Sequence, residues 1–200
     1  MINLRNYQQS AVDAIRRAYA NKKRAPLLVL PTGGGKTTIF AYVTQQASFK
    51  NNCVFLLCHR AELVKQISMT LAKFDVCHQV IAPPVIITQC RNSHYLEFGK
   101  AFIAPSNVYV CSVQTLIKRL NTMPTPDLIV CDEAHHLTPD STWGKIIQSH
   151  PKARVLPVTA TPCRLDGKGL KDICDDMIIG ETMENLIKQG YLCNYRAFCP

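Results

Sequence analysis

Residues 31–38, PTGGGKTT, combine the residue types that bind a polyphosphate through the protein backbone. Three consecutive glycines let the chain turn tightly, so that successive N–H groups point toward one anion. A helix that begins at Lys36 adds the positive end of its dipole. In this pattern Lys36 reaches the β and γ phosphates of a nucleotide, and Thr37 ligates magnesium. The candidate nucleotide-binding residues of this loop are Thr32, Gly33, Gly34, Gly35, Lys36, Thr37 and Thr38.

The loop departs from the general phosphate-loop pattern at one position. Leu30 stands where that pattern has a glycine, so the match is to the variant P-T-G-x-G-K-T. The alternative interpretation is a glycine-rich turn with an exposed lysine. A strand before the loop and a helix after it, as the sequence predicts here, favour the phosphate loop.

A second candidate site is the acidic pair Asp132-Glu133, which directly follows the apolar run 128–131. An aspartate at the end of a buried strand can hold magnesium through water, opposite a phosphate loop. The adjacent glutamate can orient and deprotonate an attacking water. Alone, the pair would be read as an ordinary acidic surface turn. The upstream phosphate loop makes Lys36, Asp132 and Glu133 the candidate catalytic residues, with Thr37 and Asp132 as magnesium ligands.

Short apolar runs alternate with segments of helical periodicity, so strands and helices in turn must position these residues. The runs predict strands at 27–30, 53–58, 108–111, 128–131 and 155–158. Helices are expected after Asn6 as an N-cap and at 36–48, 63–74, 113–120, 142–149 and 183–189. This order predicts an α/β fold with a mostly parallel central sheet and helices on both faces. The stretch 74–105 is the least regular; 89–100 could form a helix, and no chemistry is assigned to it.

Ligands of a parallel α/β sheet bind at the carboxyl ends of its strands, and five predicted strands end in polar residues or glycines. These ends are the glycine loop, His59-Arg60, Ser112 to Thr115, Asp132 to His136, and Thr159 to Thr161. Because these ends would all meet at one edge of the sheet, together they are stronger evidence for a ligand site than any single motif match.

The composition limits the class of protein. The chain has 200 residues, 47% of them hydrophobic, which suffices for one sizeable core. The net charge of +9 is compatible with a polyanionic partner without proving one. No apolar run is long enough to span a membrane, and residues 1–10 contain no export signal. We therefore expect a cytoplasmic protein.

The ten cysteines are expected to be reduced thiols, because they show no C-x-x-C pair and several lie in apolar runs. A zinc site at Cys77, His78, Cys90 and His94 is a weaker alternative, since this spacing fits no common ligand pattern.

The motifs PTGGGKT, DEAH (132–135) and TAT (159–161), in this order, resemble the first motor domain of superfamily 2 nucleic-acid helicases. Those DEAD/DEAH-box-like proteins have a RecA-like fold. The opening LRNYQ (4–8) resembles their adenine-reading element, and TATPCRLDG (159–167) is most similar to RadD-type DNA-repair helicases and restriction-enzyme motor subunits. The resemblance covers 4–200 and implies an ATP-dependent helicase or translocase that uses ATP and Mg²⁺.

The resemblance also implies roles for further residues. Gln8 would hydrogen-bond the adenine edge, with Arg5 nearby; the alternative for Gln8 is a solvated first-turn residue. His135, Thr159 and Thr161 would link the nucleotide site to the nucleic-acid face, although the threonines could also be β-branched strand residues. His136 is expected to be a structural neighbour.

The nucleic-acid contacts implied by the resemblance are His59, Arg60, Ser112, Gln114 and Thr115, whose side chains suit phosphate oxygens. The expected partner is single-stranded or forked DNA, although RNA remains an alternative. The cations at 16–17 and 22–24 are interpreted as complements of a helix dipole. Arg164 and Lys168 could contact nucleic acid or another domain.

Helicases of this kind close ATP between two RecA-like domains, and the segment after the TAT motif is too short for a second one. We expect a RecA-like ATP-binding domain at 1–190, with 191–200 leaving it as a strand toward a second RecA-like domain. Alone, the chain would hydrolyse ATP slowly if at all, because arginine fingers come from that second domain. The alternatives are a small-molecule kinase, a nucleotide-switched binding module without motor activity, and the motor subunit of a restriction enzyme.

Overall fold

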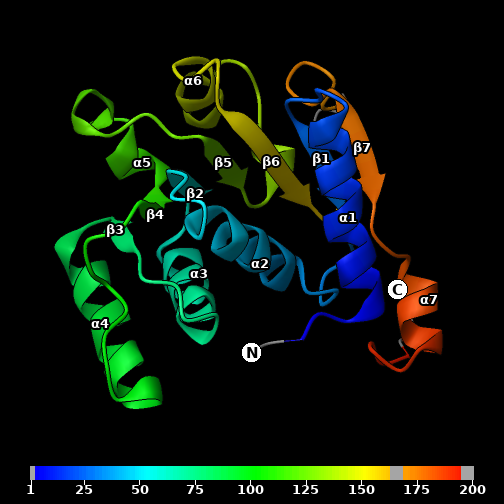
Figure 1. Ribbon diagram of the computed structural model, residues 1–200, viewed down its shortest axis with the longest axis horizontal. Helices are drawn as coiled ribbons and strands as arrows, with labels where there is room; N and C mark the ends of the chain where they lie inside the picture. Colours follow the sequence, from blue (N-terminus) through cyan, green and yellow to red (C-terminus); the bar gives the residue numbers. More distant parts are fainter. Residues whose placement is uncertain (1–2, 163–168, 195–200) are drawn as a thin grey trace, which may run out of the picture.

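One parallel sheet organises the chain (Figure 1). In the computed structural model, which describes residues 3–162 and 169–194, the strand order is β3-β4-β2-β5-β6-β1-β7. Every described pair of neighbouring strands runs parallel. The strands are β1 (Pro26–Val29), β2 (Val54–Cys58), β3 (Gln79–Ile81), β4 (Val108–Ser112), β5 (Leu128–Cys131), β6 (Arg154–Thr159) and β7 (Asp176–Ile179).

Helices connect the strands and cover both faces of the sheet. The α-helices are α1 (Asn6–Ala20), α2 (Lys36–Ser48), α3 (Ala61–Lys73), α4 (Pro84–Phe98), α5 (Val113–Leu116), α6 (Thr142–Gln148) and α7 (Met183–Lys188). Two short 3₁₀ helices are η1 (Leu120–Thr122) and η2 (Ala134–His136). No helix in the described residues combines the length and apolar character needed to cross a bilayer.

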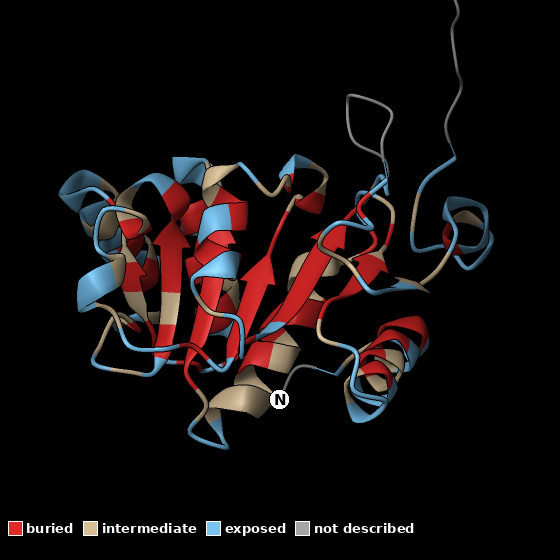
Figure 2. Cartoon of the chain, turned by 90° about the horizontal axis from the view of Figure 1, so that it is seen from above, coloured by how far each residue is buried: buried red, intermediate tan, exposed pale blue. Residues whose placement is uncertain are grey.

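Two apolar clusters lie on opposite faces because successive side chains of a strand point to opposite sides. In β2, Val54, Leu56 and Cys58 belong to one cluster, whereas Phe55 and Leu57 belong to the other. The first cluster includes residues of α1, α2, α3, α4 and α7, and the second includes residues of α5 and α6. Figure 2 shows the central strands as buried between helices whose outer sides are exposed. The predicted α/β fold with helices on both faces is therefore confirmed.

Most predicted elements are present, with boundaries shifted by one or two residues. Asn6 is not the N-cap of α1: Arg5 takes that position with extended backbone, and Asn6 is the first helical residue. The helix predicted at 113–120 stops after Leu116, with only Val113 and Leu116 buried.

The irregular stretch 74–105 contains β3 and α4, of which β3 was not predicted. The helix starts at Pro84 rather than at residue 89, because a proline is well placed at the first position of a helix, where its missing N–H is not needed. The edge strand β7 was also missed. Residues 191–194 do not form the expected strand: the N–H groups of Tyr191 and Leu192 both bond to Leu186 O, which folds them back onto α7.

Candidate nucleotide and nucleic-acid site

The loop between β1 and α2 has the backbone geometry of an anion-binding turn. Gly33 and Gly35 have φ angles of 78° and 83°, a region that favours glycine. Gly34 must also lack a side chain, because a Cβ there would approach the buried Leu30 side chain to 2.8 Å. Leu30, which stands where the general motif has a glycine, thus packs its side chain against the loop at Gly34. The helix α2 begins at Lys36 with no side-chain cap, which leaves its first N–H groups free for a ligand.

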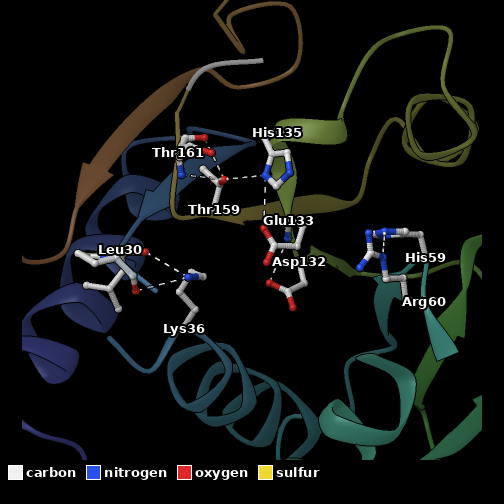
Figure 3. A network of polar contacts seen from close by, with 10 residues as sticks. Leu30, Lys36, His59, Arg60, Asp132, Glu133, His135, Thr159 and Thr161 are labelled. Carbon is white, nitrogen blue, oxygen red and sulfur yellow. Dashed lines mark hydrogen bonds and ion pairs between the residues drawn. The ribbon is translucent and has the colours of Figure 1, made fainter. Parts of the chain in front are cut away.

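Lys36 lies inside this loop and faces the acidic pair (Figure 3). Its Nζ donates to Leu30 O at 3.3 Å and to Pro31 O at 3.4 Å. Burial lowers the pKa of the Lys36 ammonium, while the nearby charges of Glu133 and Asp132 raise it. The Lys36 ammonium therefore interacts electrostatically with the carboxylates of Asp132 and Glu133 at the same edge of the sheet.

Asp132 and Glu133 leave the end of β5 through a sharp turn. Glu133 has a φ of 56° and a ψ of 50°, a left-handed conformation that costs a non-glycine residue about 1–2 kcal/mol. Its N–H donates to Asp132 Oδ1 at 3.0 Å. Asp132 is only 6% exposed, and burial raises the pKa of its carboxyl, with Glu133 adding to the effect and Lys36 opposing it. Strained backbone of this kind gathers at functional sites.

The residues around Lys36 suit magnesium with a nucleotide. Asp132 and the Thr37 hydroxyl supply hard oxygen donors, and a buried carboxylate beside a second one is relieved by a divalent cation. No group of three or more acidic, histidine or cysteine side chains in the described residues could hold a metal ion by itself. Mg²⁺ usually keeps several waters and takes phosphate oxygens as ligands in addition to one or two protein side chains.

The predicted coupling residues lie in contact. His135 Nδ1 is 3.3 Å from Glu133 Oε2 and 3.3 Å from Thr159 Oγ1 (Figure 3). Thr159 Oγ1 donates to Thr161 O at 2.9 Å and accepts from the Thr161 N–H at 3.2 Å. Thr159 is fully buried, and its hydroxyl has hydrogen-bond partners in both the Thr161 backbone and His135.

The predicted adenine-reading residues flank the loop from the start of α1. Gln8 is only 5% exposed, which excludes a solvated first turn. Its Oε1 accepts from the Arg5 N–H at 3.0 Å, and its Nε2 lies against Gly35. Tyr7, which lies in the LRNYQ segment but received no role from the sequence, donates from its hydroxyl to Gly34 O at 2.9 Å. The sequence signal that could have indicated this contact is the position of Tyr7, one residue before Gln8.

The candidate nucleic-acid residues gather at the ends of β2 and β4. Cys58 and Ser112 are paired in register, so the residues that follow each strand share one edge. Arg60 Nε donates to His59 Nε2 at 3.1 Å (Figure 3), while the buried His59 Nδ1 has no hydrogen-bond partner in the part of the chain that the structure describes. The His59 ring packs against His136, with centroids 5.0 Å apart. His59 therefore orients Arg60 rather than standing free.

Ser112, Gln114 and Thr115 form the second half of this edge. Ser112 Oγ donates to Gln114 Oε1 at 2.8 Å, which leaves the Gln114 amide NH₂ free to donate. Gln114 is exposed, Thr115 is partly exposed, and Ser112 is 9% exposed. The structure thus brings all five predicted nucleic-acid residues to the same side of the sheet as the nucleotide loop.

His78 and His94 are hydrogen-bonded to Ser68 rather than arranged as the alternative zinc site. Ser68 Oγ lies between His78 Nε2 at 2.7 Å and His94 Nε2 at 3.1 Å. Cys77 is exposed, and Cys90 is buried against the core. The two imidazoles instead belong to a hydrogen-bonded network between α3 and α4.

The basic cluster before β1 has a structural role at Arg24. Its guanidinium donates to the carbonyl oxygens of Ala153, Ile147 and His150, at 3.1 to 3.3 Å. Arg16 pairs with Asp13 at 3.1 Å. The predicted role as a complement of the helix dipole fits Arg17, which lies in the last turn of α1, but not Arg24, whose guanidinium binds carbonyl groups near the end of α6. Arg164 and Lys168 lie outside the described residues.

The fold and the site together define the RecA-like motor domain of superfamily 2 helicases. Two solved structures share the fold. One is a nuclease-deletion mutant of the Type ISP restriction-modification enzyme LlaGI in complex with a DNA substrate mimic, with a TM-score of 0.69 and 17% identity over 95% of this chain and 21% of that one. The other is the Pyrococcus furiosus Hef helicase domain, with a TM-score of 0.60 and 20% identity over 88% of this chain and 37% of that one.

The chain belongs to the family described as the type III restriction enzyme, res subunit, whose family model matches residues 1–164. It is 32% identical over 209 residues to the proposed ATP-dependent helicase IRC3 of Saccharomyces cerevisiae, covering 95% of this chain and 28% of that protein. A 51.5 kDa protein of a Lactococcus phage is 31% identical over 168 residues, covering 84% of this chain and 31% of that protein. The chain spans less than a third of the length of either relative.

Proposed function

We propose that this chain is the ATP-binding half of an ATP-dependent nucleic-acid motor, a helicase or translocase that couples ATP hydrolysis to movement on DNA. One observation carries the proposal. Lys36 faces Asp132 and Glu133 at the end of the sheet, and His135 joins Glu133 to Thr159 by two contacts of 3.3 Å. A motor needs a phosphate loop and a carboxylate that activates water. It also needs residues that connect this nucleotide site to the nucleic-acid site.

The residues divide the chemistry of ATP hydrolysis. The N–H groups of Gly33 and of Gly35 to Thr38, together with the Lys36 ammonium, bind the phosphates; the Gly34 N–H instead donates to Pro31 O. Charge on the lysine stabilises charge that develops on the γ-phosphoryl group. Thr37 and Asp132 would hold Mg²⁺, which would supply electrostatic stabilisation of the phosphate oxygens. Glu133 orients the attacking water and accepts its proton. Gln8 and Arg5 read the base.

The same edge of the sheet offers the nucleic-acid contact. Arg60, Ser112, Gln114 and Thr115 carry donors suited to phosphate oxygens. The LlaGI neighbour, which was solved with a DNA substrate mimic, supports DNA as the expected partner. We expect single-stranded or forked DNA, a second RecA-like domain in the intact protein, and a role in DNA repair.

The test is steady-state ATPase activity of the chain and of the full-length gene product, with and without single-stranded DNA. Lys36→Ala should abolish binding of Mg-ATP, because it removes the cation that meets the phosphates. Lys152→Ala is the matched control, since Lys152 is an exposed lysine near the amino end of β6, opposite the site. Wild-type binding of Mg-ATP that survives Lys36→Ala would overturn the proposed site.

The need for a second domain is tested by the same assay. The chain alone should turn over ATP far more slowly than about 1 per second, the lower end of ordinary enzyme turnover, because the arginine finger of the partner domain is absent. Ordinary motor rates from the pure chain would contradict this part of the proposal.

A restriction-enzyme motor subunit is a second candidate, favoured by the family description and by a further relative. The E. coli protein described as a type I restriction enzyme EcoAI endonuclease subunit is 24% identical over 96% of this chain. The full-length product would then cleave DNA in an ATP-dependent reaction. Translocation or unwinding without cleavage would favour the helicase.

A further inference from the structure

The three glycines of the phosphate loop are each contacted by a group from outside the loop. Gly35 lies against the Gln8 amide, and the Gly34 carbonyl accepts from Tyr7. A Cβ at Gly33 would meet the Leu192 side chain at 2.8 Å. The first two contacts come from the start of α1, but the third comes from the segment after α7, more than 150 residues away in sequence. The wall beside the loop is thus built from both ends of the described chain.

Tyr191 completes this wall beside Leu192. The Arg5 guanidinium lies over the Tyr191 ring, with Cζ 4.3 Å from the ring centroid. The Tyr7 and Tyr191 rings are tilted against each other with centroids 5.5 Å apart, and Arg5 Nη1 donates to the Tyr7 hydroxyl at 3.3 Å. Three flat groups, two aromatic and one cationic, therefore gather next to Gln8, whose Nε2 has no hydrogen-bond acceptor among the described residues.

The Tyr191 ring is held in place by its own segment. Gly190, with a φ of 73°, reverses the chain after α7. The N–H groups of Tyr191 and Leu192 then bond to Leu186 O at 2.8 and 3.1 Å. Leu186 is fully buried in the core. The contacts of the Tyr191 ring with Arg5 and Tyr7, and of Leu192 with Gly33, place this anchored segment next to the nucleotide loop. At 38% exposure the ring still offers surface to a ligand.

We infer that Tyr191 is a base-stacking residue of the nucleotide site, forming with Arg5 the flat wall against which the purine base of the nucleotide packs. The inference depends on the proposed function, since it names a further determinant of the same site. Aromatic rings and guanidinium planes both stack on nucleobases, and the Gln8 amide beside them can meet the polar edge of the base. Phosphate affinity would come from the loop, and base affinity partly from a segment outside every motif in the sequence.

The two contributions separate when Mg-ATP is compared with inorganic tripolyphosphate, which lacks the base and sugar. Isothermal titration of the chain would measure both dissociation constants. Tyr191→Ala should weaken Mg-ATP binding by about tenfold, as expected when one stacking partner is lost. Binding of tripolyphosphate should stay within about twofold, a difference well below 1 kcal/mol. Tyr191→Phe keeps the ring and should bind ATP like the wild type.

Two controls distinguish stacking from a structural tether. Tyr95→Ala removes an exposed tyrosine of α4, at the far end of the sheet, and should change neither constant. Tyr191→Leu keeps apolar bulk in the segment and should fall to the level of Tyr191→Ala; wild-type ATP affinity in the leucine variant would mean that Tyr191 only packs.

Failure of the inference is separable from failure of the proposed function. Unchanged ATP affinity in Tyr191→Ala, or equal loss for ATP and tripolyphosphate, would overturn the stacking role while leaving the phosphate site intact. A wild-type chain that binds neither compound would overturn the proposed function itself.

Discussion

The Ser68–His78–His94 network makes a specific prediction about stability at acid pH. All three side chains are fully buried. His78 Nδ1 donates to Val76 O at 2.9 Å, so its Nε2 is the acceptor for the Ser68 hydroxyl at 2.7 Å. His94 Nδ1 accepts from the Phe102 N–H at 3.2 Å, so its Nε2 donates to Ser68 at 3.1 Å. Both rings are therefore used as neutral imidazoles.

Protonation of His78 breaks this arrangement, because the Ser68 hydroxyl proton then loses its acceptor. Burial lowers the pKa of His78 from 6.5 to about 4, with the Val76 carbonyl opposing the shift and His94 adding to it. Burial also lowers the pKa of His94, which Glu97 partly opposes. Between pH 6.5 and about pH 4, His78 binds a proton in the unfolded chain but not in the folded chain. The free energy of unfolding therefore falls as the pH falls.

The size of the effect follows from linkage. A shift of this size corresponds to about 3 kcal/mol, lost progressively as the pH falls from about 6.5 to about 4. Between pH 7 and pH 5, His78 alone should remove about 2 kcal/mol from the free energy of unfolding. That is a large part of the usual stability of a domain.

The assay is urea unfolding at pH 7 and pH 5 for the wild type and His78→Gln. The variant is expected to lose about 1–3 kcal/mol at pH 7, because a glutamine cannot match both hydrogen bonds of the ring. Its loss between pH 7 and pH 5 should be smaller than that of the wild type by about 2 kcal/mol. His150→Gln removes a histidine of the loop after α6, outside the network, and should leave the pH dependence unchanged. Parallel pH dependence in the wild type and His78→Gln would refute the reasoning.

Three further predictions concern the site and the core. Glu133→Gln should lower ATPase activity of the full-length product by at least about 100-fold while Mg-ATP still binds, because the amide cannot accept the proton of the attacking water; equal activity would remove the general base. Arg60→Ala should weaken single-strand binding and reduce the slope of log affinity against log salt by about 0.7, one phosphate contact, whereas Lys188→Ala, at α7, should not alter the slope. Arg24→Ala should cost about 2–3 kcal/mol in urea unfolding because it orphans buried carbonyls, against at most about 0.5 kcal/mol for Arg17→Ala; similar losses would contradict the structural role of Arg24.

Several elements were predictable because their cause is local. The apolar run that became β5 (Leu128–Cys131) is buried on both faces and was located to the residue. The helix α2 starts at Lys36, as predicted, because Gly35 supplies the left-handed turn before it. By contrast, β3 and β7 are short edge strands whose sequences lack a long apolar run, so only pairing with β4 and β1 defines them.

The candidate site also contains features that the sequence could predict and features that it could not. The sequence by itself determined that the phosphate loop and Asp132-Glu133 follow two strands, since parallel strands bring their carboxyl ends to one edge. It could not determine that the chain folds back after α7, because Tyr191 and Leu192 reach the loop only through the buried anchor at Leu186. Nor could spacing predict that Ser68 joins His78 to His94. Contacts between residues distant in sequence depend on how the helices pack against the sheet, and that packing was decided by the tertiary structure.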